Sequence, residues 1–150
     1  MRRKDRELGA DDALKVLIQG EYGVLSTVGA DGQPYGIPLS YVYRDNVVYF
    51  HCATEGHKLE NLASNPGVSF CVVGRTQVLP AEFATKYESA VIFGSASEVQ
   101  GTEKQAALLA LLEKYSPDFM ESGKSYIEQN TSRTKVVKIS IDRLTGKARK

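Results

Sequence analysis

The chain has 150 residues, 42% of them hydrophobic, and its 19 basic and 18 acidic side chains leave a formal charge of +1. This length and hydrophobic content fit one core, so we expect a single domain over residues 1–150. The balanced charge creates no overall field for nucleic acid or an anionic membrane, and the basic runs at residues 1–4 and 147–150 are short enough to be solvated tails. Neither nucleic acid nor a membrane is therefore an expected partner.

Cysteine content and hydropathy indicate the cellular compartment of the protein. Cys52 and Cys71 both lie inside apolar runs, where a thiol usually packs as a small hydrophobe, and they suggest no disulfide framework. No stretch approaches the ~20 apolar residues of a membrane span, and the charged N-terminus is not followed by the hydrophobic region of a signal peptide. We expect a cytoplasmic protein.

The first predicted elements are a helix and a β-hairpin. Asp11 or Asp12 can cap the helix, and Gly20 can end it. A strand over residues 22–28 then runs through a glycine-containing turn into a return strand over residues 33–43.

The return strand has two prolines on one face, Pro34 and Pro38. Proline cannot donate a hydrogen bond to a neighbouring strand. At these positions the strand must therefore be an edge, be bulged, or face something other than a strand, and a ligand could fill that place.

Residues 47–62 are the most informative stretch of the chain. A turn at residues 44–46 precedes it, because Asp and Asn tolerate left-handed backbone conformations. The first half of the stretch is apolar, β-branched and aromatic, which predicts a buried strand. Leu59 and Leu62 then have the spacing of a helix, which Asn65-Pro66 should end. A strand is thus expected to run into a helix.

The turn between this strand and this helix carries Thr54, Gly56, His57 and Lys58. Free N–H groups at a helix N-terminus, the missing Cβ of Gly56 and two basic side chains together suit an anion. The segment alone leaves open an ordinary strand-to-helix turn with a solvated Lys and His.

The second half of the chain predicts more strands and one long helix. Thr102 should cap this helix and Ser116-Pro117 should close it. Segments 74–86 and 118–133 are expected to be irregular, the second with a short helix. Further strands are expected at residues 68–73, 89–99 and 135–141. About six strands and three helices, mostly joined by hairpin-like links, favour a mainly β fold, an antiparallel barrel with flanking helices.

Common catalytic and metal motifs are absent from the chain. It has neither G-x-G-x-x-G nor G-x-x-x-x-G-K-[ST], and residues 94–97 lack the second glycine of a nucleophile elbow. His51, Cys52, His57 and Cys71 lack the paired spacings of a zinc site. We therefore expect no bound metal.

A set of short segments is distinctive when it is taken in order. The segments are Gly36-Ile37-Pro38-Leu39-Ser40-Tyr41-Val42-Tyr43, Val48-Tyr49-Phe50-His51-Cys52-Ala53, Gly56-His57-Lys58-Leu59, Asn65-Pro66, Val68-Ser69-Phe70-Cys71-Val72-Val73, Tyr87-Glu88-Ser89, Phe93-Gly94 and Leu144-Thr145-Gly146-Lys147. Together they resemble the pyridoxamine 5′-phosphate oxidase-related flavoproteins, and most closely their nitroimidazole-resistance subgroup.

The resemblance implies an FMN-binding split β-barrel that forms a homodimer with the flavin at the subunit interface. It implies an FMN-dependent oxidoreductase with a small-molecule substrate, such as a reductase of nitroimidazole or other nitroaromatic compounds, with NAD(P)H as the expected electron donor. The implied flavin contacts are Ile37, Pro38, Leu39, Ser40, His51, Cys52, Ala53, Gly56, His57, Lys58 and Ser89. The arginine-rich substrate-phosphate segment of pyridoxamine phosphate oxidase itself is missing, which argues against vitamin B6 oxidation.

His51 is the candidate catalytic residue, because a histidine facing the flavin could give a proton to a substrate near neutral pH. A histidine that is packed or only contacts the ring is the alternative. Cys52 should point to the opposite face of the strand, which favours core packing. For the whole protein the alternatives are a non-catalytic flavin carrier or sensor, or a barrel that holds haem or deazaflavin F420.

Overall fold

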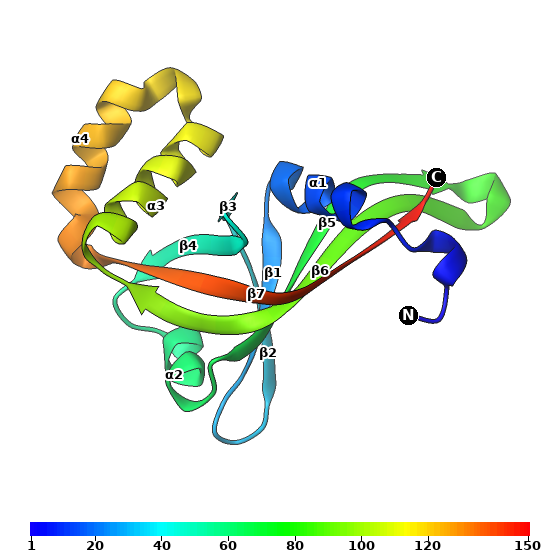
Figure 1. Ribbon diagram of the computed structural model, residues 1–150, viewed down its shortest axis with the longest axis horizontal. Coiled ribbons are helices and arrows are strands. Elements are labelled where there is room, and N and C mark those ends of the chain that lie inside the picture. Colours follow the sequence, from blue (N-terminus) through cyan, green and yellow to red (C-terminus); the bar gives the residue numbers. More distant parts are fainter.

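A seven-stranded antiparallel sheet forms the body of the protein in a computed structural model that describes residues 1–150 (Figure 1). The strand order is β2-β1-β5-β6-β7-β4-β3. The strands are β1 Gly23–Val28, β2 Pro34–Leu39, β3 Val42–Arg44, β4 Val47–Ala53, β5 Gly67–Leu79, β6 Ala84–Val99 and β7 Thr134–Arg149. The α-helices are α1 Ala10–Gln19, α2 His57–Ser64, α3 Gly101–Tyr115 and α4 Met120–Asn130. Short 3₁₀ turns lie at Lys4–Arg6, Pro80–Glu82, Pro117–Phe119 and Thr131–Arg133.

The main core lies on the inner face of the curved sheet. Strand side chains alternate between the two faces, so every second residue, such as Leu25, Phe50 and Ile92, is fully buried there. Helix α1 adds the buried Leu17, and α2 adds the half-buried Leu59. Both helices are thus held by the same apolar cluster as the strands.

Helix α3 covers part of the outer face. Leu108 packs with Val136 of β7, and Leu111 packs with Val42 of β3. The half-buried Tyr49 of β4 contacts both of these apolar clusters. Figure 1 shows α3 and α4 on one side of strands β4, β7 and β6, with α2 on the other side.

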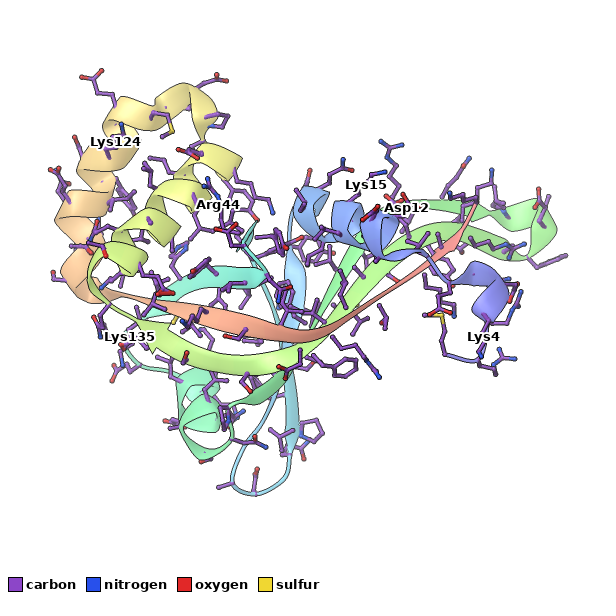
Figure 2. The ribbon with its side chains drawn as sticks, viewed as in Figure 1. Lys4, Asp12, Lys15, Arg44, Lys124 and Lys135 are labelled. Carbon is purple, nitrogen blue, oxygen red and sulfur yellow. The ribbon has the colours of Figure 1, made fainter.

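Polar contacts add to this packing of α3. Arg44 of β3 reaches α3 in Figure 2, where its guanidinium lies 2.9 Å from the carboxylate of Glu113. None of the four helices is both long and apolar enough to cross a membrane.

Several sequence predictions are confirmed. The fold is mainly β with flanking helices. The proline-bearing strand β2 is an edge that pairs only with β1, so neither Pro34 nor Pro38 interrupts a second ladder. Asp45 and Asn46 have the expected left-handed conformation, with φ of 48° and 64°. Helix α2 ends at Ser64, just before Asn65-Pro66.

The predicted strand 33–43 is wrong, because the chain leaves the ladder at Ser40-Tyr41 and β3 lies at the opposite edge of the sheet. The cause is the fully buried Tyr41. Its hydroxyl donates to the carbonyl of Leu17, and its N–H donates to the Tyr115 hydroxyl at 3.0 Å. Contacts with two helices far away in sequence therefore replace strand pairing at this point.

The segments predicted to be irregular are ordered. Residues 76–79 pair with residues 84–87 across a 3₁₀ turn, so segment 74–86 is the end of a long β5–β6 hairpin, and residues 120–130 form α4. Neither Asp11, Asp12 nor Thr102 caps a helix, because Gly9 and Gln100 occupy those N-cap positions. The last strand continues well beyond residue 141, because its second half pairs with the N-terminal half of β6.

Candidate functional site

The turn between β4 and α2 joins a strand to a helix, as the sequence predicts. Gly56, the N-cap residue of α2, has φ of 147° and ψ of 169°, a conformation that residues with a Cβ rarely adopt. No side chain caps this end of α2, although the N–H groups of Leu59 and Glu60 bond to the Gly56 carbonyl at 3.1 Å. The N–H groups of His57 and Lys58, at the start of the helix, have no side-chain partner and are available to an anion.

Two basic side chains flank this turn. The imidazole of His57 packs edge-on against the ring of Tyr35 on β2, with centroids 4.6 Å apart, and its Nδ1 lies 3.7 Å from a carboxylate oxygen of Glu60. Lys58 is half-buried. The turn therefore lies beside the strand whose outer edge is unpaired.

Lys58 also lies near Cys52. Burial raises the pKa of the Cys52 thiol, and the positive charges of Lys58 and Lys135 oppose that rise. Lys135 lies at the start of β7 in Figure 2 and pairs with Cys52 across the β4–β7 ladder. A thiol with a raised pKa is not a ready nucleophile, and Cys52 packs against the main core as predicted.

His51 faces the other side of β4. Its ring is partly open to solvent and makes no hydrogen bond within the chain, while the surrounding protein atoms lower its pKa by burial. The imidazole is therefore neutral at pH 7, and each ring nitrogen is free to donate or accept one hydrogen bond.

A cavity of about 370 Å³ opens beside His51. Ser40, which directly follows β2, lines it together with His51, so the structure brings these two predicted residues to one place. The rest of the wall comes from α3, α4 and the residues that follow α4. Its apolar side chains include Leu108, Leu111, Leu112 and Ile127.

Sequence reasoning missed these residues of α3 and α4. The sequence predicts α3 as a long helix without a site residue, and it predicts residues 118–133 as an irregular segment with a short helix. Tyr126, Ile127 and Asn130 all line the cavity, and their three- and four-residue spacing is that of one helix face. That spacing is the signal that would have placed them together.

Of the remaining predicted flavin contacts, those on β2 and β4 lie near the turn or the cavity, and the one on β6 does not. Ile37 and Leu39 are half-buried against the main core, whereas Pro38, between them, is exposed on the outer face of β2. Ala53 is exposed at the end of β4, close in sequence to the turn. Ser89 lies apart from all of these within one subunit, because it pairs with Val73 and Lys147 in the N-terminal half of β6.

Comparison with known protein families concerns nearly the whole chain. The sequence model of a family described as pyridoxamine 5′-phosphate oxidase matches residues 9–148. The chain belongs to this family. The match confirms the family that the ordered motifs indicated, and none of the curated proteins searched matches the chain.

Several solved structures share the fold. A candidate 5-nitroimidazole antibiotic resistance protein from Bacteroides thetaiotaomicron is 23% identical with a TM-score of 0.81, covering 95% of this chain and 86% of its own. An FAD-binding protein from Mesorhizobium loti is 24% identical with a TM-score of 0.69, covering 97% and 98%. A FAD- and haem-binding protein from Mycobacterium smegmatis is 19% identical with a TM-score of 0.82, covering 95% and 73%. At these identities the likeness shows the shared fold.

Proposed function

We propose that the protein binds FMN and acts as a flavin-dependent oxidoreductase. The observation that carries the proposal is the uncapped N-terminus of α2, where Gly56, His57 and Lys58 lie beside the unpaired edge of β2. FMN ends in a phosphate, and backbone N–H groups with a lysine are a suitable donor set for it. A Cβ added at Gly56 meets no atom within 4 Å, so the turn has room for that phosphate.

The position of β2 suits the binding of the flavin ring along the outer edge of this strand. Tyr35 contacts His57 at the turn, and Ser40, just beyond the other end of the strand, lines the cavity. Five residues of extended chain span roughly 17 Å. The outer edge of β2 therefore offers a path from the phosphate site to the side of the sheet that carries His51.

Bound flavin would supply electron and hydride transfer, while the chain binds and orients it. Gly56 and Lys58 would hold the phosphate, and the backbone of residues 37–40 would orient the ring. Helices α3 and α4 provide apolar side chains beside Ser40 and His51. His51 is the candidate hydrogen-bond donor to the substrate, because its neutral imidazole can present an N–H to a polar substituent.

We propose nitroimidazoles or related nitroaromatic compounds as substrates and NAD(P)H as electron donor. The shared fold with the candidate 5-nitroimidazole resistance protein supports this choice, and the FAD-binding relative supports a flavin.

His51 at an apolar cavity also suits a haem ligand, and one relative binds both FAD and haem. Haem is therefore the second candidate cofactor.

We also propose a homodimer that completes the flavin site. The β5–β6 hairpin carries Phe83, 97% exposed, and Val78, 68% exposed, which a second copy could cover. Ser89 lies on β6 near this hairpin and would reach a flavin only from the partner subunit. Light scattering with flavin bound should give twice the chain mass, and a monomeric mass would contradict the shared site.

The absorption spectrum of the purified protein tests the cofactor. Two flavin bands support the proposal, a Soret band indicates haem, and a single deazaflavin band indicates F420. A colourless protein that takes up no added FMN would overturn it. Oxidation of NAD(P)H that depends on an added 5-nitroimidazole then distinguishes a reductase from a carrier or sensor.

A further inference from the structure

The cavity between β4 and the α3–α4 pair has the size of a small-molecule site. Its volume of about 370 Å³ lies within the roughly 300–1,000 Å³ that is usual for ligand pockets. Leu108, Leu111 and Leu112 of α3 and Ile127 of α4 give it apolar walls. These walls suit the faces of a flat apolar ring.

Several polar groups of the lining are engaged within the chain. The Tyr115 hydroxyl donates to the carbonyl of Glu21 at 2.6 Å. The Asn130 amide donates to the carbonyl of Tyr126 at 2.8 Å, and the Thr134 hydroxyl donates to the Asn130 carbonyl at 2.9 Å. These bonds hold α3 and α4 in place.

Four other polar side chains of the lining make no hydrogen bond within the chain: Ser40, His51, Ser116 and Tyr126. Ser40 and His51 come from the sheet and lie on the wall nearest the proposed flavin. Ser116 and Tyr126 come from the helical side. A ligand in this largely apolar space can therefore find hydrogen-bonding partners on both the strand side and the helical side.

The cavity has no counter-charge for an ionised ligand. No Lys, Arg, Asp or Glu side chain lines it. Burial lowers the pKa of His51, so that group is also neutral at pH 7. A phosphate or carboxylate would lose its hydration here without gaining an ion pair, which is strongly unfavourable.

Helix α4 forms the wall that is least tied to the sheet. It buries none of its residues and packs chiefly on α3 and on the 3₁₀ turns at its two ends. Gly123 of α4 packs against α3, where an added Cβ would lie 2.2 Å from a methyl of Leu112. The helical wall of the cavity is therefore packed separately from the main core.

We infer that this cavity is the substrate site and takes a small uncharged aromatic or heteroaromatic molecule. Ser40 and His51 hydrogen-bond its polar substituent, and Leu112 and Ile127 pack on its ring. The inference deepens the proposed flavin-dependent function and rests on it. Phosphorylated compounds, including pyridoxamine 5′-phosphate itself, do not fit this cavity.

Two nitroaromatic probes of similar size test the charge of the ligand. We would titrate the FMN-loaded protein, with isotope-labelled Ile and Leu methyl groups, with 4-nitrobenzyl alcohol and with 4-nitrobenzoate. The neutral probe should give nuclear Overhauser contacts to the methyls of Ile127 and Leu112, and the carboxylate should bind at least tenfold more weakly. Equal binding of the two probes, or contacts elsewhere, would overturn the inference.

A pair of variants on one helix tests the location. Ile127→Trp should fill the cavity and weaken binding of 4-nitrobenzyl alcohol at least tenfold, with FMN affinity unchanged. Ser125→Trp places the same bulk on the exposed opposite face of α4 and should bind the probe like wild type. Unchanged binding by Ile127→Trp would refute the site, and if that variant does not fold, the methyl contacts of the wild-type protein decide.

Other occupants give different results. Contacts of the flavin dimethylbenzene ring with Ile127, with loss of the probe signals, would assign the cavity to the cofactor and contradict the inference. Contacts between Ile127 and a differently labelled copy of the chain would assign it to the dimer interface, again against the inference. Probe binding by a protein that takes up no FMN would refute the flavin proposal while leaving the ligand site supported.

Discussion

The ring of Tyr35 on β2 packs edge-on against the imidazole of His57, the first residue of α2, with centroids 4.6 Å apart. This contact joins the unpaired edge of the sheet to the proposed phosphate site. Edge-to-face aromatic pairs contribute about 0.5–1.5 kcal/mol beyond the apolar area that they bury. The orientation of the turn thus depends in part on a residue outside it.

Tyr35→Ala should therefore loosen the start of α2. We expect FMN affinity to fall several-fold, because part of the phosphate contact must then be ordered on binding. Tyr35→Phe keeps the ring and should bind like wild type. Flavin fluorescence quenching measures the FMN affinity of all three proteins. Equal affinities for wild type and Tyr35→Ala would show that the ring contact does not organise the site.

The local features of this region were predictable from sequence, and its long-range features were not. Gly56, the basic residues after it and the β2 prolines each carry their own conformational signal. The departure of the chain at Tyr41 depends instead on contacts with Leu17 and Tyr115, which no local periodicity reveals. The cavity was missed for the same reason, because its walls come from segments far apart in sequence.

Gly94 sits at a register shift between β6 and β7, where a Cβ would lie 2.1 Å from the carbonyl oxygen of Ser140. Backbone cannot move aside as a side chain can, so Gly94→Ala should reduce the free energy of unfolding by about 1–3 kcal/mol or more. Gly36→Ala on β2 is the matched control, since its Cβ would lie 3.6 Å from its nearest neighbour, Val24. Urea denaturation compares the two, and equal stabilities would contradict the packing described at Gly94.

Asn61 of α2 is buried and donates to the Thr27 hydroxyl at 3.0 Å. Thr27→Val leaves the Asn61 amide unpaired and should cost about 1–3 kcal/mol of unfolding free energy. The double variant Thr27→Val with Asn61→Leu removes both polar groups. Its free energy of unfolding should fall by less than the sum of the losses measured for the two single variants. Strict additivity in urea denaturation would mean that this bond does not tie α2 to β1.

The lowered pKa of His51 gives a pH dependence with a definite sign. In the unfolded chain a histidine titrates near its ordinary pKa of about 6.5, whereas burial lowers the pKa of His51 in the folded state. Between those two values the unfolded state binds more protons, so the free energy of unfolding falls as the pH drops below about 6.5. Wild type should therefore lose more stability than His51→Gln between pH 7 and pH 5.

Denaturant titrations of both proteins across that range measure the difference, which should grow steadily as the pH falls. In the folded wild type, NMR should show the His51 ring less protonated than a free histidine at the same pH. Parallel stability profiles would mean that His51 is not held neutral by burial, and its role as a neutral donor at the cavity would lose its basis.

The affinities of FMN and riboflavin for wild type and Lys58→Ala test the central proposal most directly. A charge-assisted hydrogen bond to a phosphate contributes on the order of 1.5–3 kcal/mol, so Lys58→Ala should weaken FMN binding roughly 10- to 100-fold. Riboflavin lacks the phosphate and should bind both proteins about equally. If the variant binds FMN like wild type, or loses both flavins together, the phosphate does not bind at the Gly56-His57-Lys58 turn.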